Sequence, residues 1–590
     1  MIFPIAKNFL KNDGFYTFKT ALSSDNLYEF YTASQSCDDI SFSQDEKLLP
    51  EEYTINIDSD GVIISHSTDE GAFRAVTTLF QLYAHCDGKP PFSKISDKPD
   101  FEDRGYLLDI SSGRIPKPET LKTLIDVLAL LKYNQFQLSM DDFCFKFPLI
   151  PQVAEGFECY TPEDMADLDR YCRERFIKFV PCQNCLGHME NWLSRDEYKH
   201  LAVGYGKGKT NTINPLLAES RKLIDDIFDS LLPCFSSEYV NVCMDEAGGL
   251  GKYELEEPCE KIGKDTFFMN YLGDLADTIG KKHGKKVMFW SDMINSYPDC
   301  FKMIPKDAIA LEWGYEIKND EKMLEHCRKF KEMGIDYYVC PSVNTHFAFT
   351  GRFDTASHNI RCAAEIGWAN GAKGFLVTDW GGDKTEGHPC FGVWSFLPAA
   401  LAGQYAWNVE EEQKQWIMDT FFERRAREFT DFFVFGKKDL SKYIQRLANY
   451  MLLEPERTRL GTMAGLLFVR PQGETSYMDY FNLKECGDAF YFDNVCEYVH
   501  KCMKDVEKLD IDPVYKREIL INSKMVILAS EFCKIRMNII PDEDKIQELL
   551  SLVDEIECEF RKLWLGRNYE KGVECFLKTL GARKRELISL

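Results

Sequence analysis

The chain has 590 residues, 45% of them apolar and 28% charged, which is typical of a globular protein with several domains. Its formal net charge of -24 at pH 7 disfavours nucleic acid and anionic membrane surfaces as partners, because both would repel it. No apolar stretch is long enough to span a bilayer, and no signal peptide is recognisable at the start. The 21 cysteines are scattered through predicted elements, which favours reduced thiols and a cytoplasmic protein.

Residues 1–98 predict a small α+β domain. Two alternating apolar runs, 53–57 and 62–65, flank a turn-forming segment and predict a β-hairpin. An amphipathic pattern over 70–84 predicts a helix after the hairpin. Prolines at 90, 91 and 99 indicate a linker to the next domain.

Residues 99–408 alternate between strand-like and helix-like segments. Short apolar runs predict eight strands, at 105–110, 135–140, 178–181, 239–244, 286–290, 308–313, 336–340 and 374–378. Helical patterns lie between or after them, at 118–132, 162–176, 215–232, 264–283, 320–331, 354–370 and 391–404. The connection 293–306 is the weakest helix of the series. This alternation predicts a (β/α)₈ barrel, and a doubly wound open sheet is the alternative.

Residues 409–590 show helical periodicity and few strand signals. Five segments favour helices, at 410–433, 440–453, 493–509, 512–540 and 542–565. We therefore expect a helical C-terminal domain.

Polar and aromatic residues follow the predicted barrel strands. The fourth strand ends in two adjacent carboxylates, Asp245 and Glu246, and a charged pair at the end of a buried strand is costly without a purpose. The other strand ends supply Asp109, Asp141, Asp142, Asn184, His188, Trp290, Asp292, Glu312, Trp313, Asn344, His346, Asp379 and Trp380. In a barrel this rim is the active-site face.

Three tryptophans and several carboxylates on one rim indicate a carbohydrate site. Aromatic rings pack against the C–H faces of a sugar, and carboxylates accept hydrogen bonds from its hydroxyls. Cleavage of a glycoside also needs a carboxylic acid that protonates the leaving oxygen. The rim therefore favours a glycoside hydrolase acting on a small carbohydrate.

Six segments in order along the chain resemble glycoside hydrolase family 20, the β-N-acetylhexosaminidases. They are residues 104–111, 131–138, 187–188, 244–246, 289–292 and 378–381. The small domain that precedes them is similar to the companion domain of that family. The resemblance implies an exo-acting, retaining enzyme without cofactor or metal that releases terminal β-linked GlcNAc or GalNAc. A homodimer is left open.

The resemblance also implies substrate-assisted catalysis, in which the substrate's own 2-acetamido oxygen attacks the anomeric carbon. Glu246 would be the general acid and base, and Asp245 would orient the acetamido N–H. Other roles carried over from the family are substrate contacts by Trp290, Trp313, Trp380, Arg104 and Asp383, and a supporting pair of His188 with Asp142. The residue that contacts the acetamido oxygen is not identified.

Three other readings stay open. A conventional retaining glycosidase needs a separate nucleophile, for which Asp379 and Glu312 are the candidates. A non-catalytic barrel could bind sugar without turnover. A metal-dependent hydrolase could use His188, His346, Asp245 and Asp379, while Cys182 and Cys185 with His188 make an incomplete zinc set.

Overall fold

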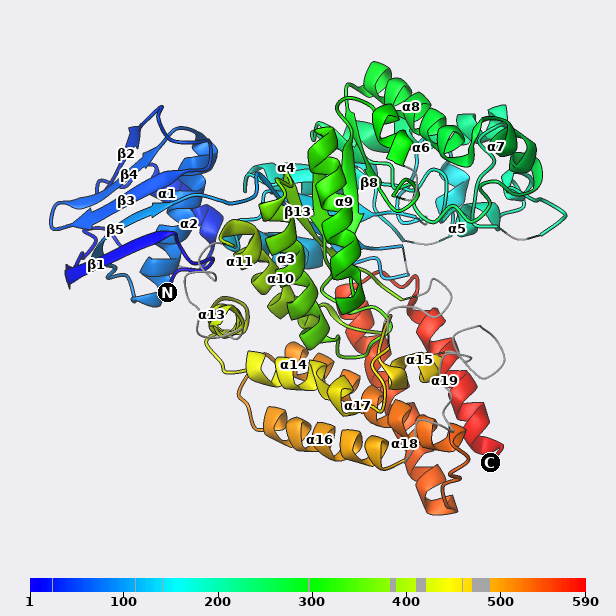
Figure 1. The fold of residues 1–590 in the computed structure, drawn as a ribbon. Helices are drawn as coiled ribbons and strands as arrows, with labels where there is room; N and C mark the ends of the chain where they lie inside the picture. Colours follow the sequence, from blue (N-terminus) through cyan, green and yellow to red (C-terminus); the bar gives the residue numbers. More distant parts are fainter. Residues whose placement is uncertain are drawn as a thin grey trace.

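The computed structural model describes residues 1–590 apart from 24, 112, 142, 157, 209, 296–297, 383–388, 410–420, 459 and 470–488. Three parts follow one another along the chain, a small sheet with two helices, a barrel and a group of C-terminal helices (Figure 1). Within the described ranges, every helix is too short or too polar to cross a bilayer.

The N-terminal part is a five-stranded sheet in the order β1-β5-β3-β4-β2. Its strands are β1 Asn8–Phe15, β2 Ile40–Gln44, β3 Tyr53–Asp58, β4 Gly61–His66 and β5 Pro91–Asp97. Buried and half-buried residues alternate along β3, because one face of the sheet packs against α2 Asp69–His85. The shorter α1 Leu27–Ser34 packs beside α2. The predicted hairpin and helix are confirmed.

Eight parallel strands close into a barrel in the order β10-β11-β12-β13-β6-β7-β8-β9. They are β6 Asp103–Asp109, β7 Gln135–Ser139, β8 Lys178–Cys182, β9 Tyr239–Asn241, β10 Lys286–Trp290, β11 Ile309–Trp313, β12 Tyr337–Cys340 and β13 Gly374–Asp379. The seam closes through six residue pairs between β13 and β6. The predicted barrel is therefore confirmed, and the open sheet is excluded.

Helices surround the barrel on its outside. The main ones are α3 Pro118–Leu130, α4 Pro162–Arg173, α6 Ala218–Leu231, α8 Lys264–His283, α9 Asp320–Met333, α10 Phe353–Ala369 and α11 Phe396–Trp407, with the short α5 Glu190–Leu193 and α7 Glu256–Ile262. Proline opens α3 and α4, and Gly334, at a φ of 66°, ends α9 in the left-handed conformation. Between β10 and β11 a 3₁₀ helix, Pro298–Met303, takes the place of the weak predicted helix.

The C-terminal part is helical. It contains α13 Phe421–Phe429, a π-helical turn Thr430–Val434, α14 Ser441–Ala448, α15 Met463–Val469, α16 Phe490–Glu507, α17 Pro513–Arg536, α18 Glu543–Arg567 and α19 Val573–Ile588. The centre of this group is α17, which packs against α15, α16 and α18. The sequence did not predict α15 and α19. The domain limits at 98 and 408 stay predictions.

Buried ion pairs join the small domain to the start of the barrel strands. Glu51 accepts from Arg74 Nε at 2.7 Å and from Arg104 Nη2 at 2.5 Å. Close by, Lys132 donates to Asp97 Oδ2 at 2.9 Å. All five side chains are at least nine-tenths buried, where an unpaired charge would be costly. The amino-terminal end of the barrel is thus a charged but internally paired interface.

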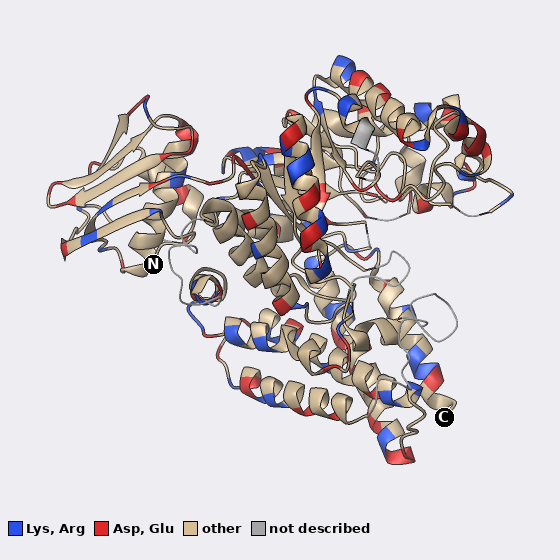
Figure 2. Ribbon diagram, in the orientation of Figure 1, with Lys and Arg blue, Asp and Glu red and all other residues tan. Residues whose placement is uncertain are grey.

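Acidic and basic residues are mixed over the outer helices. Figure 2 shows Lys, Arg, Asp and Glu alternating along α9 instead of gathering in a patch of one sign.

Candidate active site

The inside of the barrel is filled by alternate residues of its strands. Successive side chains of a strand point to opposite faces, so every second residue faces the barrel axis. These inward residues form one cluster, Leu107, Val180, Cys182, Tyr239, Cys243, Met288, Trp290, Ile309, Leu311, Tyr338, Cys340 and Leu376. Trp313 and Trp380 pack against the cluster at the carboxyl ends of β11 and β13. The barrel is thus a packed core with tryptophans on its carboxyl-terminal end.

The three predicted tryptophans are brought together. The ring centroids of Trp290 and Trp380 lie 5.9 Å apart, and the Trp313 ring stacks on Tyr315 at 5.0 Å. Trp380 Nε1 donates to the Tyr315 hydroxyl at 2.9 Å, which links the two pairs. The buried Nε1 of Trp290 has no hydrogen-bond partner in the part of the chain that the structure describes. Together the rings make an aromatic wall, and the unpaired Trp290 N–H is suited to a ligand.

The acidic pair follows β9 on an unusual backbone. Cys243, Met244 and Glu246 have φ values of 56°, 71° and 44°, in the left-handed region that costs a non-glycine residue about 1 kcal/mol or more. Neighbouring groups hold this conformation, since the Cys243 N–H donates to Asn241 Oδ1 at 3.0 Å and the Glu246 N–H donates to Asp292 Oδ2 at 3.2 Å. The two neighbouring carboxylates therefore have different surroundings: the side chain of Asp245 is 17% exposed, and that of Glu246 is 57% exposed.

A glycine lets the His188 loop approach the acidic pair. A Cβ at Gly187 would lie 2.1 Å from the Asp245 carbonyl oxygen, a backbone atom that cannot move aside. Only glycine therefore fits at this position. The next residue, His188, is held with a φ of 51°.

His188 contacts both carboxylates. Its Nε2 lies 3.4 Å from Asp245 Oδ2 and 3.2 Å from Glu246 Oε2. Burial by itself lowers the pKa of His188, but the hydrogen bonds to Asp245 and Glu246 outweigh burial and raise the pKa to about 11. The imidazole is therefore charged at neutral pH and sits between two acids. The structure brings these three predicted residues together.

Asp292 lies next to Asp245 and Glu246, since its Oδ2 accepts from the Glu246 N–H. Burial, followed by the charge of Asp245, raises the pKa of Asp292 from 3.8 to about 7. Among the described residues, neither the buried Asp245 Oδ1 nor the buried Asp292 Oδ1 has a hydrogen-bond partner. Buried polar atoms without partners are rare, and at the open end of a barrel they are suited to a ligand.

Arg104 does not belong to this end of the barrel, and we correct the prediction of a substrate contact. It lies near the start of β6, while the strand ends at Asp109. Its guanidinium donates to Glu51 and to the carbonyls of Phe101 and Lys132. With its nitrogens engaged at the amino-terminal end, Arg104 joins two domains.

Two other predicted residues, Asp142 and Asp383, lie outside the described residues. The carboxylate before the first of them, Asp141, is buried and accepts from Asn184 Nδ2 at 2.6 Å. Burial lowers the pKa of His188, and the contacts with Asp245 and Glu246 raise it. The charge of Asp141 raises it further. A negative group supporting His188 is therefore present at this strand end.

The two candidates for a separate nucleophile face away from the barrel axis. Glu312 lies between the inward residues Leu311 and Trp313, and it is bonded to Ser291 at 2.6 Å and to His326 of α9 at 2.7 Å. Asp379 accepts from Tyr106 at 2.7 Å and from Ser395, just before α11, at 2.8 Å. Both are at least nine-tenths buried.

Of the four proposed metal ligands, only His188 and Asp245 lie together. His346 accepts from Arg352 Nη2 at 3.2 Å, and burial, with the charge of Arg352 second, lowers its pKa to about 3. Cys182 Sγ lies 3.4 Å from Cys243 Sγ, and Cys185 Sγ donates to the Val242 carbonyl. With Asp379 facing outward, the metal-dependent alternative loses its ligand set.

Sequence reasoning missed two residues. Tyr315 lies two positions beyond Trp313, so continuing the strand alternation past the strand end would have found it. Arg114 follows β6, with Nη2 at 3.7 Å from Asp379 Oδ1, and its buried Nε and Nη2 have no hydrogen-bond partner among the residues described. It lines a cavity of about 80 Å³ between the barrel and α17 and α18. The guanidinium of Arg114 thus lies near the carboxyl-terminal end of β13, where Arg104 does not reach.

Comparison with known proteins identifies the family. Residues 101–366 match the model of the catalytic domain of glycosyl hydrolase family 20, and residues 16–98 match its domain 2. The chain belongs to glycosyl hydrolase family 20. The two matches together span more than half of the chain and cover the first seven barrel strands and most of the small sheet.

Several proteins similar in sequence are beta-hexosaminidases. A beta-hexosaminidase of Porphyromonas gingivalis is 25% identical over 42% of this chain and 36% of its own length. The mouse beta-hexosaminidase alpha subunit is 28% identical over 46% of this chain and 55% of its own. The chain therefore spans a third to about half of the length of these relatives.

Solved structures share the fold. A β-N-acetylhexosaminidase from Bacteroides fragilis matches with a TM-score of 0.58 at 18% identity, over 73% of this chain and 94% of that one. A chitobiase from Flavobacterium johnsoniae has a TM-score of 0.56 at 18% identity, over 99% of both chains. The second match extends over the C-terminal helices as well.

Proposed function

We propose that this protein is an exo-acting β-N-acetylhexosaminidase that releases terminal β-linked GlcNAc or GalNAc with retention of configuration. One observation carries the proposal: Asp245 and Glu246 stand side by side, separated by a strained backbone, at the tryptophan-bearing end of a family 20 barrel. The names of the similar proteins, all beta-hexosaminidases, support the same activity.

The different settings of the two acids suit two tasks. Asp245 is largely buried, and one of its oxygens has no partner within the described ranges, so it can accept the N–H of a substrate's acetamido group. The acetamido oxygen then attacks the anomeric carbon, while Glu246 gives its proton to the leaving oxygen. Glu246 is more than half exposed, so it can turn from His188 toward the scissile bond. It then takes a proton from the water that opens the oxazolinium intermediate.

The surrounding groups fit these tasks. His188 Nε2 lies 3.4 Å from Asp245 Oδ2, which leaves Asp245 Oδ1 as the oxygen that accepts the acetamido N–H. Trp290, Trp313 and Trp380 offer apolar faces to the sugar and its acetyl group. Tyr315 holds Trp380 and is our candidate for the acetamido contact, and Arg114 is the candidate for the hydroxyl-binding cation expected of Arg104.

A mechanism with a separate protein nucleophile is not favoured. It requires a second carboxyl group about 5–5.5 Å from the acid, open to the sugar. Glu312 and Asp379 are buried on the outer side of their strands and bonded to the helix layer. With neither of these candidates open to the sugar, we infer that the substrate's own acetamido group is the nucleophile.

Hydrolysis of 4-nitrophenyl N-acetyl-β-glucosaminide and galactosaminide tests the proposal. We expect turnover by the wild type and a loss of about 10²–10⁴-fold in kcat for Glu246→Gln, which removes the acid but keeps the size of the side chain. Glu257→Gln, an exposed position on α7, is the matched control and should leave kcat unchanged. Sugar binding without turnover by the wild type would contradict the proposal and leave a non-catalytic carbohydrate-binding barrel.

A further inference from the structure

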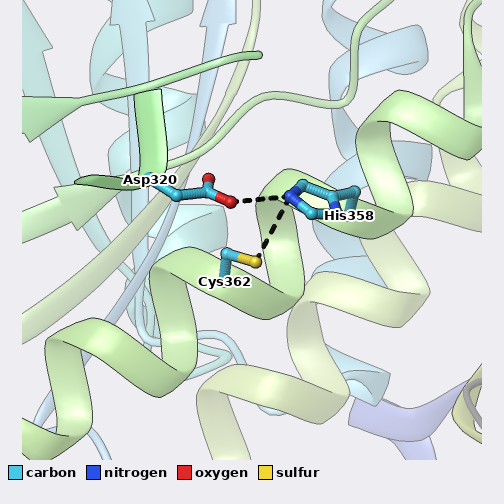
Figure 3. Close-up of side chains that lie close together, drawn as sticks. All are labelled: Asp320, His358 and Cys362. Atoms are coloured by element: carbon cyan, nitrogen blue, oxygen red, sulfur yellow. Dashed lines mark hydrogen bonds and ion pairs between the residues drawn. The ribbon is translucent and has the colours of Figure 1, made fainter. Parts of the chain in front are cut away.

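Three metal-type ligands meet outside the barrel, away from the acidic pair. Asp320 is the first residue of α9, and His358 and Cys362 lie one turn apart on α10. His358 Nε2 is 2.8 Å from Asp320 Oδ2 and 3.4 Å from Cys362 Sγ (Figure 3). Within the part of the chain that the structure describes, this is the one group of three such side chains whose ligand atoms all lie within 4.8 Å of one another.

The spacing and chemistry of these atoms match a small divalent ion. Residues four apart on a helix lie on the same face, so His358 and Cys362 point to one spot. A tetrahedral zinc ion at about 2.0–2.3 Å from each ligand would hold its donor atoms roughly 3.3–3.8 Å apart. The histidine–sulfur distance already fits this range, and the histidine–carboxylate distance would have to open by several tenths of an ångström.

The geometry points to a zinc-class metal site formed by Asp320, His358 and Cys362. Nitrogen and sulfur ligands select such ions over Mg²⁺ and Ca²⁺, which prefer oxygen. The side chains of Asp320 and His358 are 33% and 25% exposed, so solvent can reach the site and a water can complete four ligands. The alternative explanation for the closeness of Asp320 and His358 is a plain hydrogen bond between them, which a bound metal would replace.

The location suggests a structural role. Asp320 comes five residues after Tyr315, so it anchors the far end of the loop that carries this tyrosine. Asn359, next to His358, donates to Asn344 Oδ1 and accepts from the Ser342 N–H, both at 2.8 Å. A metal between α9 and α10 therefore ties together two helices that support the ends of β11 and β12, without touching substrate.

Metal binding to the full-length chain tests the site. After treatment with a chelator and dialysis, the wild type should bind one equivalent of Zn²⁺ or Co²⁺ tightly. The Co²⁺ form should show a thiolate-to-metal absorption band in the near ultraviolet, and Zn²⁺ should raise the thermal midpoint. Cys362→Ser should abolish the band, and both Cys362→Ser and His358→Gln should lose the bound equivalent.

A matched control is available on α16, where Cys496 and His500 have the same spacing of four residues. Cys496→Ser should keep the full equivalent, the absorption band and the thermal shift. Failure of the wild type to bind either ion would overturn the proposal. So would an unchanged band in Cys362→Ser, because the thiolate would then come from another cysteine. The readouts are independent of glycoside hydrolysis.

Discussion

The two ends of the barrel use charged residues in opposite ways. At the amino-terminal end, Glu51 accepts from Arg74 and Arg104, and Asp97 accepts from Lys132, all of them buried. At the carboxyl-terminal end, two carboxylates stand next to each other on a strained backbone and share one histidine. Opposite charges are matched at one end, and negative charge is concentrated at the other.

The difference shows that burial of a charge does not by itself indicate function. Arg104 is more buried than Asp245 or Glu246, but its guanidinium is already paired with Glu51 and with the Lys132 carbonyl. Among the described residues, Asp245 and Asp292 each have a buried oxygen without a partner. Burial, followed by the charge of Asp245, raises the pKa of Asp292. Incomplete pairing combined with backbone strain marks the functional end.

Breaking the paired end should have the largest effect on stability. Glu51→Gln leaves two buried guanidinium groups facing a neutral amide, and such a loss typically costs about 3–5 kcal/mol. The thermal midpoint should therefore fall strongly, whereas kcat of the protein that remains folded should not change. Glu46→Gln, an exposed position of the same domain, is the control and should leave the midpoint unchanged. A loss of kcat without a loss of stability would reverse our assignment of this end.

Removing a charge at the functional end should change the pH dependence of stability. Burial first and then the charge of Asp245 raise the pKa of Asp292 from 3.8 to about 7. A group whose pKa is raised on folding adds stability that is complete below pH 3.8 and is lost as the pH rises through about 7. Relative to Asp292→Asn, the wild type should thus become less stable across this range, by at most about 4 kcal/mol.

Thermal melts of both proteins from pH 4 to 8 measure this difference. Asp307→Asn, an exposed aspartate before β11, serves as the control and should follow the wild type at every pH. Parallel curves for the wild type and Asp292→Asn would show that Asp292 ionises normally and that the acids at this end are not coupled.

Tyr315→Phe should have the smallest effect. The change removes the hydroxyl that accepts from Trp380 Nε1 at 2.9 Å and keeps the ring that stacks on Trp313. The same hydroxyl is the proposed donor to the acetamido oxygen, and the loss of that hydrogen bond, of about 1 kcal/mol, should raise KM for an N-acetylhexosaminide about fivefold. Steady-state kinetics should show this rise, and Tyr491→Phe, exposed on α16, should not. An unchanged KM would exclude Tyr315 from the sugar pocket.

The sequence predicted the barrel because its signals are local. Short apolar runs, helix-opening prolines and acidic strand ends each report on a few neighbouring residues. The connection after β10 was already weak as a helix, and prolines at 298 and 305 leave room for a short 3₁₀ helix. Helices α15 and α19 escaped prediction because tertiary packing in the C-terminal part decides them.

The site was predicted less completely, for geometric reasons. Glu312 and Asp379 were placed on the same rim as Trp313 and Trp380, although the alternation along a strand sends neighbours to opposite faces. Arg104 was assigned by resemblance, while its position at the start of β6 already indicated the far end. The contacts among His188, Asp245 and Glu246 join separate segments, and only the fold brings them together.

The central claim is that Asp245 and Glu246 divide the work on a substrate that supplies its own nucleophile. The most direct test compares kcat/KM for aryl β-glycosides with a 2-acetamido or a 2-hydroxyl group, in the wild type and in Asp245→Ala. We predict that the wild type strongly prefers the 2-acetamido substrate and that Asp245→Ala loses most of this preference. Comparable rates on both substrates, or a preference that survives in Asp245→Ala, would contradict the account.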